Sequence, residues 1–217
     1  GRRGHTWDST AGNLLLSIVV RPNVNPAKYS GLAAVCGLAV LETLEKQGLA
    51  TEIGLKWPND LVARGRKLGG ILVEAARDNE GKPFAVCGIG VNVNYTPQEV
   101  PDGGLAAIGL SDLNESVPSV DTLLDEVYST VIDSIDAWAE QLNALADNAG
   151  PLTPVREEYI ARLNWIGERV IARSPAGGEL ASGVFQTVDD FGRASIDTED
   201  GLRSFHFEEA SLRPMSE

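Results

Sequence analysis

The sequence has few of the residues that build disulfide frameworks, metal centres or cationic surfaces. Its 217 residues include two cysteines and two histidines, and 31 acidic residues outnumber 18 basic ones, giving a formal net charge of −13. Two cysteines in apolar surroundings are too few for a disulfide framework and favour a reducing, cytoplasmic compartment. The negative charge makes nucleic acid an unlikely partner for this portion, because a general nucleic-acid surface needs a basic face.

Long hydrophobic runs are also missing. The longest apolar stretch, residues 31–44, contains Glu42 and is shorter than a membrane span, so no membrane partner is expected. Hydrophobic residues make up 43% of the chain and charged residues 23%, which is typical of globular proteins. The length suits one substantial core, or a main domain with a small satellite. The first residue is Gly rather than Met, so the sequence is expected to begin inside a domain.

The hydrophobic pattern predicts an α+β fold rather than a doubly wound parallel sheet, because one long helix is followed by several strands in succession. Asn25-Pro26 is a typical helix start, with an N-cap residue followed by proline at the first helical position. The expected elements are, in order, a strand at 14–20, a helix at 27–47, strands at 53–57, 68–75 and 84–93, a loop at 96–118, a helix at 121–145 and a shorter helix from Thr153-Pro154 to about residue 163.

After Trp165 the pattern changes to short β runs separated by Gly and Asp turns, which is typical of a small barrel or sandwich. A boundary near Asn164 therefore divides the chain into domains at 1–164 and 165–217. His206 is expected in the last of these strands with a structural role. The expected strands lie at 169–173, 180–188, 194–197 and 204–207.

An arginine pair between glycines opens the chain. Arg2 and Arg3 carry planar, bidentate donors suited to carboxylate or phosphate groups. Trp7 offers an apolar surface against which a ring could stack. A frayed, solvated terminus explains the same residues equally well.

Lys56 comes at the end of a predicted strand, directly before the turn residues Pro58, Asn59 and Asp60. Proline stiffens this exit and favours an extended conformation for Trp57. A fixed ammonium there could neutralise a carboxylate that attacks a phosphate. The alternative is a surface lysine beside an ordinary turn.

Glycines interrupt two of the predicted strands. Gly69 and Gly70 lie inside an otherwise strong strand and indicate a bulge or a close backbone approach to a ligand. Gly88, Gly90 and Asn92 alternate along one face, which leaves room for a flat ligand and an amide that could contact a base edge. The spacing differs from that of a dinucleotide-binding fingerprint.

The sequence lacks the motifs of several other kinds of catalysis. The sequence has no GxSxG nucleophile motif, no phosphate-binding GxxxxGK[ST] motif and no Cys/His cluster with zinc spacing. The imidazole bases are limited to His5 and His206. Chemistry here is therefore expected to rest on positioning and charge stabilisation rather than on proton shuttling.

Taken together, GRRG, KWPNDL, RKLGGILVE and GIGVNVN occur in an order and spacing that resembles the bacterial biotin–protein ligases. The resemblance implies a mixed α/β sheet related to class II tRNA synthetases and lipoate ligases, followed by an SH3-like barrel. It also implies an activity, in which biotin and ATP form biotinyl-5′-AMP and the biotinyl group passes to a lysine of a carboxyl-carrier domain. The family's threonine- and asparagine-rich biotin segment would precede Gly1, so the catalytic domain is expected to be N-terminally incomplete.

The resemblance also implies roles for single residues. Lys56 and Arg2 are the expected catalytic residues, with Lys56 touching the biotin carboxylate and the α-phosphate. The expected biotin-binding residues are Gly1, Arg2, Lys56, Gly69 and Gly70, and the expected nucleotide-binding residues are Arg3, Trp7 and Asn92.

Mg²⁺ is expected to accompany ATP, and no residue is assigned as a metal ligand. The expected partner is the biotin carboxyl-carrier domain of a carboxylase, and a homodimer stays open. Two alternatives remain, namely a lipoate-type ligase and a biotin-responsive transcriptional regulator.

Overall fold

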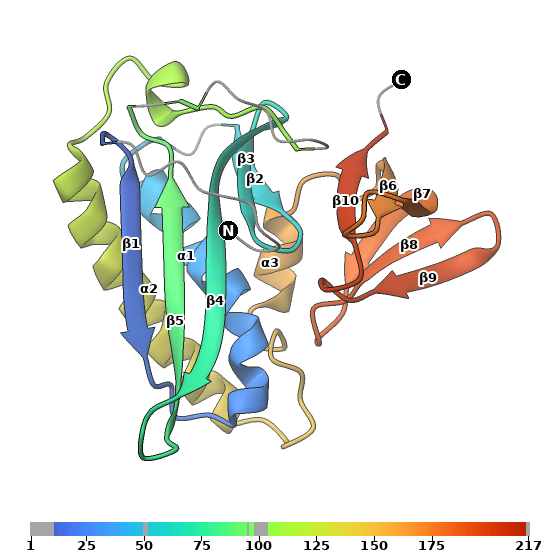
Figure 1. Ribbon diagram of the computed structural model, residues 1–217, viewed down its shortest axis with the longest axis horizontal. Helices are drawn as coiled ribbons and strands as arrows, with labels where there is room; N and C mark the ends of the chain where they lie inside the picture. Colours follow the sequence, from blue (N-terminus) through green and yellow to red (C-terminus); the bar gives the residue numbers. More distant parts are fainter. Residues whose placement is uncertain (1–10, 50–51, 95, 98–103, 216–217) are drawn as a thin grey trace.

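The computed structural model describes residues 11–49, 52–94, 96–97 and 104–215, and consists of a larger α+β part followed by a small β part (Figure 1). The larger part is built on a five-stranded sheet with the strand order β1-β5-β4-β3-β2. Its strands are β1 (Leu14–Val20), β2 (Ile53–Lys56), β3 (Asp60–Ala63), β4 (Arg66–Arg77) and β5 (Pro83–Val91).

The α+β class is confirmed, but the expected mixed sheet is antiparallel at every pairing of the described strands. The connections explain the difference. Strands β2 to β5 follow one another through short turns, and a short turn joins antiparallel strands, whereas a parallel pair needs a long crossover. The sheet is therefore a run of hairpins closed by β1, which pairs with β5 along its whole length.

Strand β3 was not expected from the sequence. Asp60 was assigned to the turn after Pro58, yet it is the first residue of a four-residue strand. Leu61, Val62 and Ala63 are all buried, so this strand lies deep in the sheet between β2 and β4. The turn between β2 and β3 therefore consists of residues 57–59, one position earlier than expected, and Lys56 pairs directly with Asp60.

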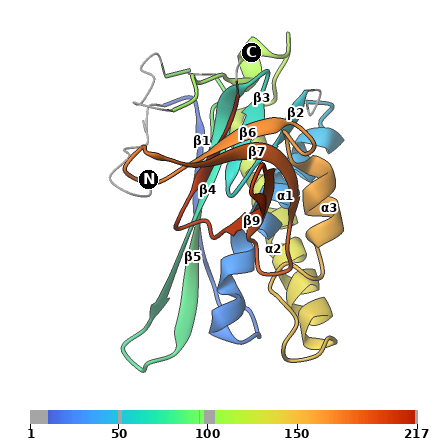
Figure 2. The same cartoon turned by 90° about the vertical axis from the view of Figure 1, so that its right-hand side faces the viewer.

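Two long helices, α1 (Leu32–Lys46) and α2 (Val120–Asn143), pack on one face of the sheet, and Figure 2 shows them with α3 (Arg156–Arg162) on the same side. The first helix starts later than expected. Residues 26–31 form the 3-10 helix η2 (Pro26–Gly31), because Ser30 and Gly31 favour a helix weakly. The Asn25 side chain caps this turn by accepting a hydrogen bond from the Ala27 amide at 3.0 Å.

The segment Pro26–Lys46 is long and apolar enough to cross a membrane, but 78% of its apolar window is buried inside the protein. It contacts α2 on one side and strands β4 and β5 on the other. The physical reason for its apolar composition is therefore that it is a core helix.

Helix α2 has the expected apolar and acidic faces. Ser119 caps its first turn, with the hydroxyl accepting from the Thr122 amide at 3.1 Å. The side chains of Val127, Val131 and Trp138 are buried. The acidic residues Asp121, Asp125, Asp133, Asp136 and Glu140 are exposed.

Helix α3 begins later than the Thr153-Pro154 cap predicted, because residues 151–155 form turns before it. A further short 3-10 helix, η3 (Leu110–Asp112), lies within the region expected to be a loop.

The small part is a second five-stranded antiparallel sheet with the order β10-β6-β7-β8-β9, consistent with an SH3-like fold. Its strands are β6 (Arg169–Arg173), β7 (Glu179–Val188), β8 (Ala194–Thr198), β9 (Gly201–Phe205) and β10 (Ser211–Pro214). His206 was expected inside a strand, but β9 ends at Phe205. A turn follows, closed by the Glu209 carboxylate, which accepts from the His206 amide at 2.8 Å.

The two parts share one continuous set of buried apolar residues. The junction is also hydrogen-bonded, since the Asn164 amide donates to the Leu55 carbonyl at 2.8 Å. A domain boundary near Asn164 stays a prediction.

Candidate functional site

A strip of glycines runs along the sheet face that is turned away from α1 and α2. Gly90 lies between Leu15 and Gly70 in the sheet register, and Gly88 pairs with Ser17. Directly opposite residues of antiparallel strands share a face, and Leu15 and Ser17 are exposed. Gly70, Gly88 and Gly90, called the glycine strip below, therefore form a floor without side chains on the outer face.

A cluster of three charged side chains lies at the β2–β3–β4 end of this strip. The Lys56 ammonium donates to the Asp60 carboxylate with an Nζ–Oδ2 distance of 3.0 Å. The Lys67 ammonium donates to the other oxygen of Asp60 at 2.6 Å. A Cβ atom on Gly70 would lie 3.4 Å from both Asp60 Oδ1 and Lys67 Nζ, so the charged cluster borders the strip directly.

The strand ends explain why these residues meet. Lys56 ends β2 and Asp60 begins β3, and the pairing of β2 with β3 places their side chains on the same face. The β3–β4 register shifts between Leu61 and Val62, where β4 carries one extra residue. This bulge lies directly before Gly69, as the paired glycines indicated.

Burial dominates the electrostatics of the cluster. Lys56 is only 2% exposed. Burial lowers its pKa, and the neighbouring Asp60 carboxylate raises the pKa against that effect. For Asp60 burial alone would raise the pKa, but Lys56 and Lys67 together hold it well below its usual range. Asp60 is therefore ionised at neutral pH.

A third cation comes from the small sheet. Arg213 on β10 lowers the pKa of Lys56 through its charge. Burial lowers the pKa of Arg213 itself, and Asp60 offsets part of this effect. Arg213 Nη1 also donates to the Leu212 carbonyl at 3.1 Å. The small part of the chain thus contributes positive charge beside Lys56.

The turn between Lys56 and Asp60 is held from behind by side chains. Trp57 is buried, and its indole N–H donates to the Gly192 carbonyl of the small part at 2.9 Å. The Tyr159 hydroxyl of α3 donates to the Pro58 carbonyl at 2.8 Å. The Asn59 side-chain amide donates to the Ile71 carbonyl of β4. These bonds fix the direction in which Lys56 and Asp60 leave the turn.

Gly69 lies at a close approach between strands. A Cβ atom there would come within 2.5 Å of the Gly90 carbonyl, which is closer than real side chains come to a backbone oxygen. Of the two glycines, Gly69 thus meets the requirement of strand packing, whereas Gly70 faces the charged cluster. Both stay predicted biotin-binding residues.

Asn92 lies beyond the end of β5, and its side chain is buried. Its amide nitrogen donates to the Ile108 carbonyl at 3.1 Å and approaches the Lys67 carbonyl at 3.4 Å. Asn13 Nδ2 lies 3.5 Å from the Asn92 side-chain oxygen. The side chain must give up part of this network to contact an adenine ring, so its nucleotide-binding role stays a prediction.

The predicted residues Gly1, Arg2, Arg3 and Trp7 lie outside the described residues. Among the residues that the structure does describe, no group of three or more His, Cys, Asp or Glu side chains could hold a metal ion.

Sequence reasoning missed three members of the charged environment, namely Asp60, Lys67 and Arg213. Asp60 follows Lys56 by four residues across a hairpin, and Lys67 lies two residues before Gly69, so both belong to the motifs KWPNDL and RKLGGILVE. Arg213 lies 157 positions after Lys56 in the numbering, and only the docking of β10 brings it near.

Comparisons with known proteins point to one family. Residues 1–94 match the biotin/lipoate A/B protein ligase family, and residues 165–213 match the biotin protein ligase C terminal domain. The biotin–[acetyl-CoA-carboxylase] ligase of Mycobacterium tuberculosis is 37% identical over 202 residues, which cover 91% of this chain and 68% of that protein. The enzyme of the same description from Paracoccus denitrificans is 32% identical, with coverage of 88% and 77%.

A solved structure shows the same fold. The biotin protein ligase from Aquifex aeolicus in complex with biotin and ATP matches with a TM-score of 0.76 and 26% sequence identity. The match covers 99% of this chain and 84% of that one.

Proposed function

Because this chain belongs to the biotin protein ligase family, we infer that its charged cluster and glycine strip together form the site where biotin is activated. The chain uses ATP to convert biotin into biotinyl-5′-AMP and transfers the biotinyl group to a carboxylase carrier. The observation that supports this location is the charged cluster of Lys56, Asp60 and Lys67, which borders the glycine strip at Gly70.

The activation step requires mainly that the site aligns biotin with ATP and neutralises their negative charges. A carboxylate oxygen of biotin forms a bond to the α-phosphorus of ATP, while the bond from that phosphorus to the bridging oxygen breaks and pyrophosphate leaves with the electron pair. No proton has to move in this step. Both reactants are anions, so the ammonium groups of Lys56 and Lys67 lower the cost of bringing them together.

The glycine strip suits the flat parts of the substrates. A floor of backbone allows a ligand to lie closer to the sheet than any side chain would permit. Gly70 is the proposed floor under biotin, and Gly69 stays a predicted biotin-binding residue. Gly1, Arg2, Arg3 and Trp7 are proposed, from the resemblance alone, to cover the biotinyl and adenylate groups.

Mg²⁺ is proposed to enter with the phosphates of ATP rather than to occupy a site of its own. Mg²⁺ in nucleotide sites is commonly held by phosphates, water and one or two carboxylates. The carboxylate nearest to the reacting groups, Asp60, already accepts hydrogen bonds from two ammonium groups. The described residues therefore do not fit a dedicated magnesium site.

The carrier that receives biotin is proposed to be the carboxyl-carrier domain of a carboxylase. Cys36 and Cys87 are buried free thiols, which supports a cytoplasmic compartment. The acidic surface supports the view that this portion does not bind nucleic acid.

Pyrophosphate release tests the function and separates it from the lipoate alternative. The purified full chain is incubated with ATP and either biotin or lipoate, and pyrophosphate is measured. We expect release with biotin and none above background with lipoate. No release with biotin, or an equal rate with lipoate, would contradict the assignment.

A further inference from the structure

A pocket lies at the junction of the larger and the smaller part of the chain, next to α3 (Figure 1). It encloses about 420 Å³ of empty space, part of which is open to solvent. Ligand pockets commonly have volumes of about 300–1,000 Å³ and mainly apolar walls. Residues of α1 line this pocket, so it lies on the helix-covered side of the large sheet, away from the glycine strip.

Four aromatic rings from three parts of the fold line this pocket, called the aromatic pocket below. Trp57 comes from the turn between β2 and β3, and Tyr159 comes from α3. Phe191 and Phe207 come from two turns of the small part. Ala33, near the start of α1, lines the pocket with only a methyl group. The surface offered to a ligand is therefore mainly ring carbon and methyl groups.

The polar groups of two of these rings are already bonded within the lining. The Trp57 indole N–H donates to the Gly192 carbonyl at 2.9 Å, and the Tyr159 hydroxyl donates to the Pro58 carbonyl at 2.8 Å. All four residues line the aromatic pocket. A charged ligand group would lose its water there without gaining a matching partner, which is costly. The lining therefore favours a neutral ligand over an ionised one.

Phe191 forms the exposed part of the lining. Its side chain belongs to a residue that is 50% exposed, and the Arg193 guanidinium lies 5.9 Å from the centre of its ring. The Asp189 carboxylate fixes the turn, because it accepts from the Phe191 amide at 3.0 Å and from the Arg193 amide at 2.9 Å. A ring seated in the aromatic pocket would cover part of the exposed Phe191 surface, and removing apolar surface from water favours binding.

We propose that the aromatic pocket binds a small neutral aromatic molecule, at a site separate from the one where biotin is activated. Trp57 and Pro58 come directly after Lys56, so the occupant would contact the back of the turn between β2 and β3. The pocket is built from both parts of the chain and exists only in the folded protein. Its ligand therefore stabilises the fold by mass action. The inference goes beyond the proposed function and does not depend on it.

The test is a fluorine NMR titration of the full chain with para-fluorotoluene, a neutral ring that carries one methyl group. We expect saturable broadening of the fluorine signal, together with a rise in the urea midpoint of unfolding when the probe is in excess. The matched probe is para-fluorobenzoate, which replaces the methyl group by a carboxylate. It is expected to bind roughly tenfold more weakly or not at all, because the pocket offers the carboxylate no partner.

Two variants locate the bound probe. Ala33→Leu fills the aromatic pocket from α1 and is expected to weaken binding of para-fluorotoluene roughly tenfold. Phe191→Ala removes the exposed ring and should weaken binding several-fold while the fold is kept, because Phe191 is half exposed. The control is Ala27→Leu, which adds the same side chain at an exposed position of η2 outside the lining and should bind like the wild type. Urea unfolding confirms that each variant is folded.

Competition separates the aromatic pocket from the site of biotin activation. Saturating biotin or ATP should leave para-fluorotoluene bound, and displacement by either would overturn the inference. Absence of saturable binding, equal binding by the wild type and Ala33→Leu, or equal affinity for the two probes would overturn it as well. Should Ala33→Leu fail to fold, wild-type affinity in Phe191→Ala decides against the pocket instead. If all these differences are seen but the wild type releases no pyrophosphate with biotin, the pocket stands and the proposed function is wrong.

Discussion

At the scale of single residues, the glycine strip presents a surface of backbone because glycine has no side chain. Gly88 lies on the outer face beside Leu72, and a Cβ atom placed on it would be 3.6 Å from the Leu72 carbonyl, an ordinary contact. The fold therefore has room for a side chain at this position. A substrate bound on the strip would occupy that space, so a side chain at position 88 would clash with it.

Gly88→Val is therefore expected to weaken substrate binding without weakening the fold. Valine suits a strand, so the melting temperature should not fall. Overpacking costs about 1–3 kcal/mol, which corresponds to a rise in KM for biotin or ATP of roughly 5- to 150-fold. The matched control is Ala76→Val, because Ala76 lies on the same outer face of the sheet, near the far end of the neighbouring strand β4. Unchanged KM values for both substrates in Gly88→Val would show that the strip is not a floor.

The sequence pointed to Lys56 but not to its partners. Pro58, Asn59 and Asp60 are such typical turn residues that a turn accounted for all of them, and the ion pairs of Asp60 with Lys56 and Lys67 were not predicted. Asn92 shows the opposite difficulty. Alternation predicted an outward-facing amide, but β5 ends at Val91 and the amide turns into a buried network. The alternation of residues along the sequence does not show where a strand ends when hydrogen bonds to distant residues determine that end.

At the scale of elements, the turn between β2 and β3 is the part of the fold on which the site depends. The Tyr159 hydroxyl of α3 donates to the Pro58 carbonyl, and the Trp57 indole donates to the Gly192 carbonyl between β7 and β8. Two separate elements thus hold the segment that carries Lys56 and Asp60.

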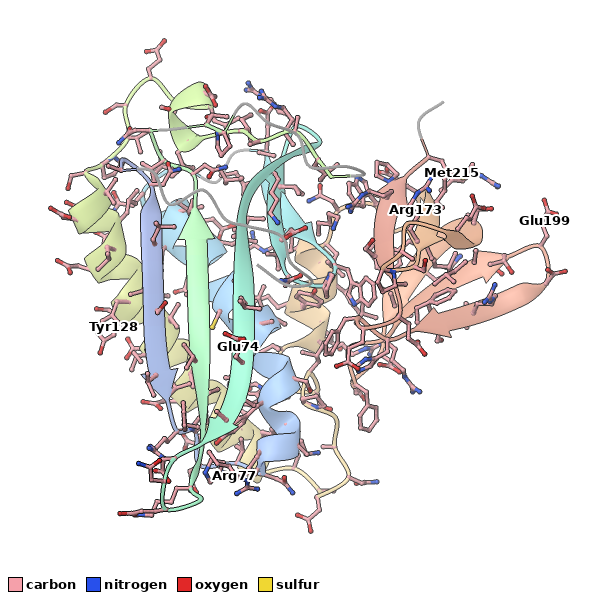
Figure 3. The ribbon with its side chains drawn as sticks, in the orientation of Figure 1. Glu74, Arg77, Tyr128, Arg173, Glu199 and Met215 are labelled. Atoms are coloured by element: carbon pink, nitrogen blue, oxygen red, sulfur yellow. The ribbon has the colours of Figure 1, made fainter. Side chains whose placement is uncertain are left out.

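Tyr159→Phe is expected to destabilise the protein through this turn. The substitution removes the donor of a part-buried hydrogen bond, which costs about 0.5–1.5 kcal/mol. Thermal or urea unfolding measures the loss. Tyr128→Phe on α2 is the control, because Tyr128 is 47% exposed and, as Figure 3 shows, lies away from the turn. Equal stability of the two variants would mean that the Tyr159 bond contributes nothing.

Long, strongly periodic elements were predictable, and short ones were not. The apolar spacing of α2 and the β-rich run of β1 matched the structure to within about two residues at each end. Strand β3 has four residues and is flanked by turns, so its buried apolar residues were too few to indicate a strand. Without β3, the antiparallel β2–β3 and β3–β4 pairings could not be predicted from the sequence.

At the scale of the whole molecule, the net charge and the charge of the site have opposite signs. The chain carries a formal charge of −13, and many of its acidic side chains line the exposed face of α2. That helix packs on one face of the sheet (Figure 2), whereas the ammonium group of Lys67 borders Gly70 of the glycine strip on the other face. The sheet thus separates an acidic surface from a local site for anions.

The central claim is that Lys56 supplies the charge that lets biotin react with ATP, and single-turnover formation of biotinyl-5′-AMP tests it most directly. Lys82→Ala is the control, since the Lys82 side chain is 68% exposed and forms an ion pair with Glu80. Lys56→Ala leaves Asp60 paired with Lys67 and should fold. We predict that it slows adenylate formation roughly 100- to 1,000-fold, as expected for one preorganised electrostatic contact. Lys82→Ala should react like the wild type. A folded Lys56→Ala enzyme that forms the adenylate at the wild-type rate would contradict the account.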